Sequence, residues 1–297
     1  MIQVENVVKT FDGFRALDGL NINVPRGAIY GLVGPNGSGK STIIRHLTGI
    51  YHQDSGSVLI DGQPVYENPA LKSRIAYIPD DLYFFLQANI KDMMRFYKGV
   101  FPNFDECRYN KLREVFNLDE KRAMRHLSKG MQKQAAFWLA LSSHPEILIL
   151  DEPVDGLDPV MRRQVWSLVM GEVAEHGATV LVSSHNLREL EDACDHVGII
   201  HKGKTVLEHS LSQLQDNIAK VQIVYPEGKF LPDDLQILHE SRSGRVQTVI
   251  IRGEIAEIEA RLAATKPVFF DMIPLTLEEI FIYEMGGAAY EIKDIIL

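Results

Sequence analysis

The chain has 297 residues, of which 45% are hydrophobic and 24% are charged, and its formal net charge is −9. This length allows one large domain and one small one. The acidic balance argues against a dedicated nucleic-acid binder, because such proteins gain much of their affinity from basic side chains on phosphate. The two cysteines, Cys107 and Cys194, lie far apart and form no CxxC pattern, which argues against a zinc site and a disulfide scaffold.

The sequence predicts neither a signal peptide nor a membrane-spanning helix. Met1–Glu5 alternates apolar and polar residues as a strand does, and the longest apolar runs, such as Ile147–Leu150, have the length of strands. A helix that spans a bilayer needs roughly 18 or more apolar residues in a row. We therefore expect a protein that is soluble by itself and reaches a membrane only through a partner.

Short strands around one helix are predicted near the N-terminus. Alternation over Ile2–Val7 and Leu20–Val24 is typical of half-buried antiparallel strands, whereas the continuous apolar run Ala28–Val33 favours a central strand covered on both faces. A glycine-rich loop follows this run and leads into a helix-forming stretch, Ser41–Leu47. Two further short strands are predicted at Ser57–Ile60 and Ile75–Ile78.

The middle of the chain changes character twice. Residues 81–126 are richer in aromatic and basic residues and show helical spacing, which predicts a helical subdomain, and a further helix is predicted over 127–143. After Pro145 the α/β pattern returns. Its predicted elements are strands over Ile147–Leu150, Thr179–Ser183 and Val197–His201 and a helix around Met161–Glu175.

The pattern restarts after about residue 216 and predicts a small α+β domain over 216–297, behind an α/β domain over 1–215. Thr276–Glu279 has the spacing of a capping box and opens a last helix. The other predicted elements are a strand with alternating Val221, Ile223 and Tyr225, a hairpin over Leu235–His239 and Val246–Ile251, a helix with the stripe Ile255, Ile258 and Leu262, and a strand over Val268–Met272.

One motif predicts a nucleotide site. The run Gly34-Pro35-Asn36-Gly37-Ser38-Gly39-Lys40-Ser41 fits the phosphate-loop pattern G-x-x-x-x-G-K-[ST]. Glycines allow backbone N–H groups to form an anion nest, and a helix N-terminus adds its positive dipole end. Lys40 can reach the β- and γ-phosphates, and the Ser41 hydroxyl can ligate Mg²⁺ with Thr42 alongside. ATP and Mg²⁺ are therefore the expected cofactors, and a plain glycine turn is the alternative.

Two acids follow the predicted strand Ile147–Leu150 directly. Asp151 at the strand end can hold Mg²⁺ through water. Glu152 can act as the general base that polarises an attacking water. Two acids after a strand often form only a solvated turn, but their position behind a phosphate loop favours the catalytic interpretation.

The motifs together resemble the ATP-binding subunits of ABC transporters over residues 1 to about 210. Leu127-Ser128-Lys129-Gly130-Met131 is similar to the LSGGQ signature of that family. Asp155-Gly156-Leu157-Asp158 is similar to its D-loop, and His185 in Ser183-Ser184-His185 to its switch histidine. Phe11 occupies the position of the aromatic residue that stacks on adenine. All of these motifs occur in the order of the family.

The resemblance implies an ABC ATPase core with an antiparallel β subdomain and a helical subdomain. It also implies roles for single residues. Ser128 and Gly130 would face the γ-phosphate bound by the other subunit, and Asp158 would belong to the nucleotide site. His185 would hydrogen-bond the γ-phosphate and the attacking water. The plainer alternatives are a helix N-cap for Ser128, a loop position for His185 and a core aromatic for Phe11.

Asp80 departs from the family pattern. It follows Tyr77-Ile78-Pro79 at the place where the family carries a glutamine that ligates Mg²⁺. A carboxylate can bind a metal but cannot donate an amide hydrogen bond. Asp80 is therefore expected to be a metal ligand near Ser41 and Asp151, and the alternative is that it caps the next helix together with Asp81.

The C-terminal segment Pro274–Phe281 resembles that of bacterial drug, antibiotic-peptide and sodium exporter ATPases. The resemblance implies a motor that works with a separate transmembrane permease and a second ATPase subunit, identical or related, at the cytoplasmic face of the cell membrane, without nucleic acid. A soluble ABC ATPase acting on ribosomes or DNA is the main alternative, although this chain has one phosphate loop and no long heptad run. A simple P-loop kinase would leave the signature and His185 unexplained.

Overall fold

The computed structural model describes residues 1–297 except 192, 212, 214–216, 227–230, 233 and 285–297. The chain divides into two compact units. The first unit comprises Met1–His185 and Ala193–Glu208. The second comprises Asn186–Asp192 and His209–Leu297. The sequence pattern had assigned residues 186–192 and 209–215 to the α/β domain over 1–215. Each unit is described by itself below.

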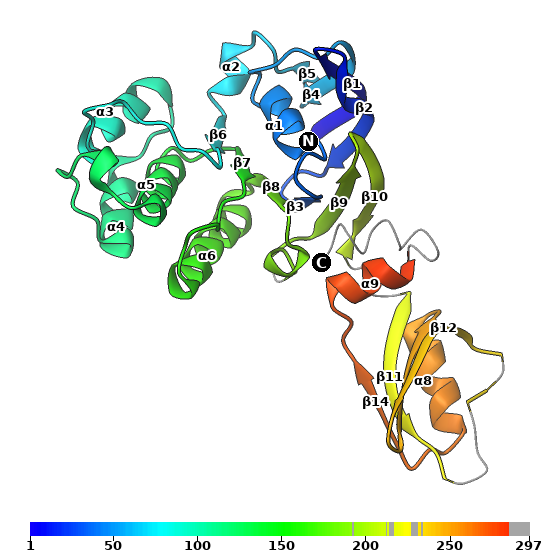
Figure 1. The fold of residues 1–297 in the computed structure, drawn as a ribbon. Helices are drawn as coiled ribbons and strands as arrows, with labels where there is room; N and C mark the ends of the chain where they lie inside the picture. Colours follow the sequence, from blue (N-terminus) through cyan, green and yellow to red (C-terminus); the bar gives the residue numbers. More distant parts are fainter. Residues whose placement is uncertain (192, 212, 214–216, 227–230, 233, 285–297) are drawn as a thin grey trace. The chain divides into compact units, whose positions relative to one another are not determined.

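A six-stranded sheet forms the centre of the first unit (Figure 1). The strands from β9 to β6 run parallel, and β3, β7 and β8 consist almost entirely of buried residues. Such continuous apolar strands suit a sheet that is covered on both faces. In spatial order the strands are β10 (Lys204–Ser210), β9 (His196–His201), β3 (Ile29–Val33), β8 (Thr179–Ser184), β7 (Ile147–Asp151) and β6 (Ile75–Ile78).

A second sheet contains four strands, the first three of them antiparallel neighbours. Its strands in spatial order are β2 (Phe14–Val24), β1 (Ile2–Phe11), β4 (Ser55–Ile60) and β5 (Gln63–Pro64). Helix α1 (Lys40–Leu47) contacts strands of both sheets, and its Ile43, Ile44 and Leu47 belong to one apolar core with residues of each sheet. The phosphate loop is thereby anchored between two layers. A short helix, α2 (Pro69–Lys72), precedes β6.

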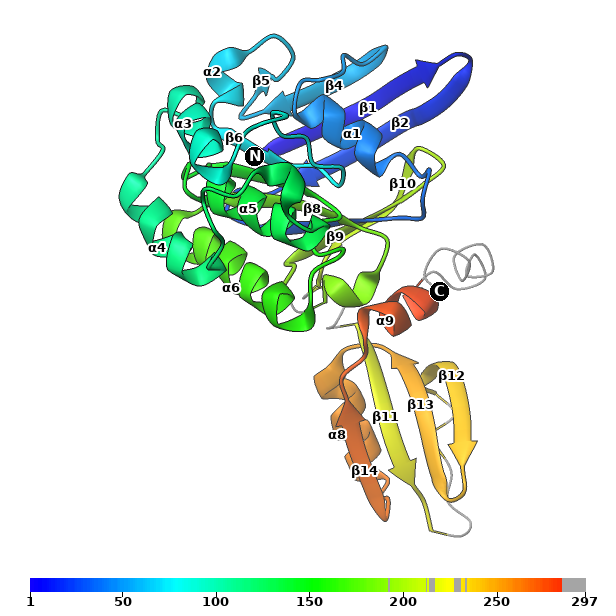
Figure 2. The ribbon, with the colours of Figure 1, turned by 60° about the vertical axis from the view of Figure 1, so that its left-hand side comes forward.

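A group of helices follows β6 (Figure 2). It contains α3 (Ile90–Val100), α4 (Glu106–Phe116), the 3₁₀ helix η1 (Met124–His126) and α5 (Lys129–Leu141). Trp138 of α5 is fully buried, stacks on Tyr109 of α4 at 4.7 Å between ring centroids, and donates its indole N–H to the Tyr109 carbonyl at 2.8 Å. This contact attaches α5 to α4. The longer helix α6 (Pro159–His176) connects β7 to β8.

The predicted cap of the first of these helices lies elsewhere. α3 begins at Ile90 with Asn89 as its N-cap, and Asn89 and Asp92 form a reciprocal capping box. Asp80 and Asp81 lie well before this start. The alternative role of Asp80 as a helix cap is therefore wrong, because a turn and a loop separate it from the helix.

In the second unit, a four-stranded antiparallel sheet packs against one helix. The strands in spatial order are β12 (Gln236–Ser243), β13 (Val246–Arg252), β11 (Ile218–Val224) and β14 (Phe269–Ile273). Helix α8 (Ile255–Ala264) places Ile258 and Leu262 on a core with residues of β11 and β13. The predicted hairpin, helix stripe and strand are confirmed.

Helix α9 (Leu277–Glu284) begins with the predicted capping box. The amide of Glu279 donates to Thr276 Oγ1 at 3.2 Å, and the amide of Thr276 donates to Glu279 Oε2 at 3.1 Å. α9 contacts the 3₁₀ helix η2 (Leu187–Glu189) of the same unit, where Arg188 forms an ion pair with Glu278 at 2.9 Å. Within the part of the chain that is described, no helix combines the length and apolar character that crossing a membrane requires.

Candidate nucleotide-binding and hydrolysis site

The phosphate loop connects β3 to α1 and depends on glycine at its last position. Gly39 has a φ of 113°, in the left-handed range, directly before α1 begins at Lys40. A Cβ on Gly39 would lie 2.9 Å from the carbonyl oxygen of Ala16 and 2.9 Å from Cδ2 of Leu17. Only glycine satisfies both requirements, so the loop can fold closely against β2 while the N-terminus of α1 stays open.

Lys40 brings a buried positive charge into this loop. Its side chain is 6% exposed, and Nζ donates hydrogen bonds to the carbonyl oxygens of Gly34 at 2.5 Å and Pro35 at 3.4 Å. Nζ also lies 3.6 Å from Oε1 of Glu152. Ser38 Oγ is buried, and none of the described residues gives it a hydrogen-bond partner. A buried cation and an unsatisfied hydroxyl in one loop fit an anionic ligand with oxygen atoms.

The two predicted acids lie at the end of β7 and differ in their surroundings. Asp151 is buried, and Ser183 Oγ of the neighbouring strand β8 donates to its carboxylate at 2.5 Å. The side chain of Glu152 is 11% exposed. Burial raises the pKa of Glu152, although the contacts to His185 and Lys40 act in the opposite direction. A carboxylate with a raised pKa is a stronger proton acceptor, as a general base requires.

His185 lies beside Glu152 because β8 is the parallel neighbour of β7. Nδ1 of the His185 ring lies 2.9 Å from Oε2 of the Glu152 carboxylate, and the backbone amide of His185 donates to the same Oε2 at 3.4 Å. The predicted catalytic pair, far apart in the sequence, is thus in direct contact. Asp155 lies close to the pair and contributes to the raised pKa of Glu152.

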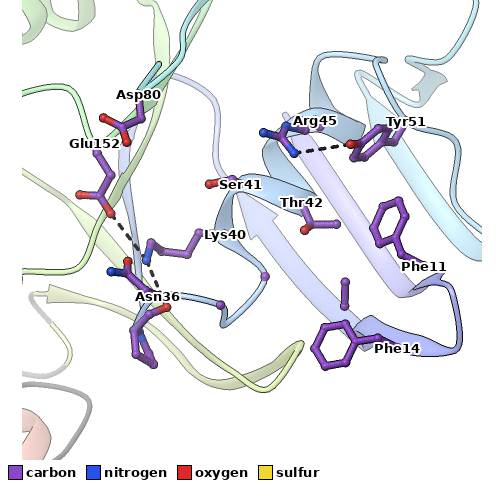
Figure 3. A pocket seen from close by; sticks show the side chains of 14 residues that line it. Phe11, Phe14, Asn36, Lys40, Ser41, Thr42, Arg45, Tyr51, Asp80 and Glu152 are labelled. Carbon is purple, nitrogen blue, oxygen red and sulfur yellow. Dashed lines mark hydrogen bonds and ion pairs between the residues drawn. The ribbon is translucent and has the colours of Figure 1, made fainter. Parts of the chain in front are cut away.

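A cavity of about 430 Å³ connects Lys40 and Glu152 to a cluster of aromatic residues (Figure 3). Glu152 and Asp80 lie at one end, Lys40 and Ser41 in the middle, and the aromatic rings at the other end. Ten of the predicted site residues line the cavity: Phe11, Pro35, Asn36, Gly37, Gly39, Lys40, Ser41, Thr42, Asp80 and Glu152. One cavity thus has a charged end, a phosphate-loop centre and an apolar end.

The aromatic end contains three residues that were not predicted. Phe11 lies 5.3 Å from Tyr51 between ring centroids, and Arg45 lies over the Tyr51 ring at 5.7 Å. Phe14 pairs with Phe11 across the turn between β1 and β2. The Asp12-Gly13 dipeptide is a strong hairpin signal and could have revealed this pair, whereas Tyr51 and Arg45 reach the cavity through the packing of α1.

The donor set suits Mg²⁺ at two of the three predicted positions. Magnesium prefers oxygen ligands and keeps several waters, and the hydroxyl of Ser41 with the carboxylate of Asp151 supplies such oxygens. Ser183 fixes the orientation of the Asp151 carboxylate through its hydrogen bond. Asp80 differs, because its Oδ1 lies 3.4 Å from Nζ of Lys133, a lysine that the sequence had not singled out.

Ser128, Gly130 and Asp158 take the positions at helix starts that the motifs indicated. Ser128 is the N-cap of α5 and accepts from the Met131 amide at 3.2 Å, and Asp158 caps α6. A Cβ on Gly130 would lie 2.7 Å from the carbonyl oxygen of Gly156, so α5 approaches the loop before α6 closely. Among the described residues that line the cavity of Figure 3, none of these three is found.

Comparison with known proteins identifies the family of the chain. A family model described as "ABC transporter" matches residues 17–155. The chain is 31% identical over 288 residues to the ABC transporter ATP-binding protein YtrB of Bacillus subtilis, covering 97% of this chain and 99% of that protein. It is 34% identical over 210 residues to the lantibiotic transport ATP-binding protein SrtF of Streptococcus pyogenes, covering 70% of this chain and 90% of that protein.

A solved structure is similar in fold. An ATP-binding subunit of an ABC transporter superposes with a TM-score of 0.67 at 26% identity, covering 72% of this chain and 92% of that one. The predicted α/β fold class of an ABC ATPase core is thereby confirmed. The chain belongs to the family of ATP-binding subunits of ABC transporters, and its activity is the binding and hydrolysis of ATP.

Proposed function

We propose that the chain is the motor subunit of an exporter, and that it hydrolyses ATP with Glu152 as general base to drive a permease on a separate polypeptide. One observation carries the chemical part of this proposal. A single cavity joins the phosphate loop, the carboxylate of Glu152 and an aromatic end. The aromatic end, the phosphate loop and Glu152 therefore follow one another in the order in which the adenine, the phosphates and the attacking water would lie.

The roles of the residues follow from their contacts. Lys40 binds the β- and γ-phosphates through its buried ammonium, exchanging its contacts with neutral carbonyl oxygens for contacts with negatively charged phosphate oxygens. Glu152 takes the proton of the attacking water. His185 holds the carboxylate of Glu152 through its hydrogen bond. Ser41 and Asp151 would hold Mg²⁺, which would supply charge neutralisation at the phosphates.

A second ATPase subunit completes the site in this proposal. Among the described residues that line the cavity of this chain, the signature residues Ser128 and Gly130 are not found. Helix α5 begins at this point, with a positive dipole end and the backbone amides of its first turn, which suit a γ-phosphate. We infer that these amides meet the nucleotide of the opposite chain in an ATP-dependent dimer, either of identical chains or with a related one.

Subunit mixing tests the composite site. Lys40→Ala abolishes phosphate binding in one chain, and Ser128→Arg blocks the signature in the other. If the sites are composite, a mixture of the two inactive proteins regains part of the ATPase activity, because one site in each mixed dimer is intact. Lack of recovery, under conditions where labelled subunits are shown to exchange, would contradict the shared site.

The permease is proposed to bind the helical group that follows β6. The loop before α3 carries large apolar side chains in solvent: Tyr83 is 94% exposed, Leu86 80% and Phe85 59%. Phe85 contacts Phe96 of α3 edge-to-face at 5.1 Å. Exposed apolar groups gathered in this way mark an interaction surface, and a cytoplasmic helix of the permease is the partner that fits a transporter subunit. Export is supported by the lantibiotic-transport relative and by the segment Pro274–Phe281.

Co-purification from membranes tests this partner and the peripheral location at the cytoplasmic face. The tagged chain should retain a hydrophobic membrane protein in detergent, and Tyr83→Ser with Leu86→Ser should lose most of it. Val268→Ser is the matched control, because Val268 is 70% exposed and lies in the second unit. Equal retention by all three proteins would exclude this surface, and recovery of ribosomes or DNA in place of a membrane protein would overturn the transport role.

A further inference from the structure

Lys133 is a buried cation that none of the sequence motifs explains. It is the fifth residue of α5, and its side chain is only 6% exposed. Its Nζ donates a hydrogen bond to the backbone carbonyl oxygen of Glu152 at 2.6 Å and lies 3.4 Å from Asp80 Oδ1. A buried ammonium is costly unless it is paired and hydrogen-bonded. Its partners are therefore specific, and one of them is the backbone of the proposed general base.

The backbone of Glu152 needs such support. Its φ is 46°, in the left-handed region that non-glycine residues seldom adopt. The next residue is Pro153, which favours an extended conformation at the residue before it. A conformation of this kind persists only where the surroundings fix it. Ser183 accepts a hydrogen bond from the Glu152 amide at 3.2 Å, and Lys133 binds the Glu152 carbonyl.

From these contacts we propose that Lys133 is a positioning residue for hydrolysis, which holds Glu152 in its left-handed conformation with Asp80 as counter-charge. The proposal rests on the role of Glu152 as general base. Ser183 fixes the amide side and Lys133 the carbonyl side of the same residue, so the carboxylate is directed toward His185 and the phosphate loop. Lys133 touches no reacting atom and acts only through Glu152.

This arrangement accounts for an aspartate at position 80. Its side chain is 55% exposed, and it pairs with Lys133 from the loop after β6. A glutamine at this position would leave the buried ammonium without a negative partner. Asp80 and Lys133 thus form one ion pair, which links α5 to the loop after β6 at the edge of the central sheet.

The same helix carries the signature residues. Ser128 caps α5, and Lys133 follows five positions later on the same rigid element. Lys133 and the signature residues therefore lie on one helix, so the support of Glu152 and the surface proposed to meet the opposite nucleotide share one element.

Kinetics of Lys133→Met test the proposal, since methionine keeps the length and removes the charge. We expect kcat to fall about ten- to a hundredfold, as for a misplaced catalytic group, while KM, the ATP dissociation constant and the ATP-dependent dimer on gel filtration stay close to those of the parent. Lys133→Arg should recover part of kcat, because a donor and a charge return. Lys111→Met, at an exposed lysine of α4, is the matched control.

Combination with Glu152→Gln separates the positioning role from a structural one. If Lys133 acts through Glu152, adding Lys133→Met to Glu152→Gln lowers the residual single-turnover rate no further. A further loss, or weaker ATP binding by Lys133→Met alone, would overturn the positioning role, and so would a parental kcat. If Glu152→Gln itself keeps the parental turnover, the proposed function fails instead, so the two failures are distinguishable.

Discussion

The two ends of the nucleotide cavity are built on different principles. At one end, beside the phosphate loop, polar contacts link Lys40, Glu152 and His185, and Lys40 and Glu152 are largely buried. At the aromatic end, Phe11 and Tyr51 meet through a ring contact, and Phe11 and Phe14 are more open to solvent. Polar contacts are directional and costly to break in a buried place, whereas apolar ring contacts tolerate substitution. Function should therefore be fragile at the first end and tolerant at the second.

Removing the general base should give the largest effect. Glu152→Gln keeps the size of the side chain and loses the proton acceptor, so the hydrolysis rate should fall by about 10²–10⁴. ATP affinity should change little, because the binding contacts remain, and the ATP-bound dimer should persist on gel filtration. Glu146→Gln, at an exposed glutamate just before the same strand, is the control. Parental turnover by Glu152→Gln would exclude the catalytic role.

Removing the buried cation should have the next largest effect. Lys40→Ala loses charge-assisted hydrogen bonds to phosphate, each of which contributes about 1.5–3 kcal/mol, or about ten- to a hundredfold in affinity. Titration calorimetry with ATP measures the loss directly. Lys72→Ala is a suitable comparison, because its Nζ also donates to a backbone carbonyl, that of Gly49, outside the cavity. Equal affinities of all proteins would contradict the phosphate role of Lys40.

The pH dependence of hydrolysis should reflect the raised pKa of Glu152. Glu152 accepts a proton only when ionised, and burial raises its pKa above the ordinary 4.5. The rate should therefore fall on acidification at a pH higher than that of an ordinary glutamate and recover as the pH rises through the raised pKa. The contact with His185 lowers this pKa, so His185→Gln should move the acidic limb further up. A limb that stays in place in that variant would argue against the coupling of the two side chains.

Substitutions at the aromatic end of the cavity should have the smallest effects. Phe11→Leu keeps apolar bulk and loses the ring face, and stacking of aromatic groups contributes about 0.5–1.5 kcal/mol beyond burial, or about two- to tenfold in affinity. Competition binding with ATP and GTP measures the effect and its base preference. Tyr66→Leu, at an exposed aromatic outside the cavity, should have no effect. A loss at Phe11 as large as that at Lys40 would erase the contrast between the two ends.

The sequence predicted the elements and motifs that depend on local pattern. The strand Ile75–Ile78, the hairpin of the second unit and the capping box at Thr276 follow from apolar periodicity and from side-chain hydrogen bonds between near neighbours. The phosphate loop was equally evident, because its glycine spacing is a local requirement. At these places a few consecutive residues contain all the information.

Only the tertiary structure decided which distant groups meet. The pairing of Asp151 with Ser183 and of Glu152 with His185 depends on the register of β7 against β8, and the contact of Lys133 with the Glu152 carbonyl depends on where α5 packs. It also decided that Asp80 faces a lysine and that Asn186–Asp192 belongs to the second unit. Sequence periodicity shows which face of an element is apolar, but buried polar partners are selected by packing between elements that are far apart in the chain.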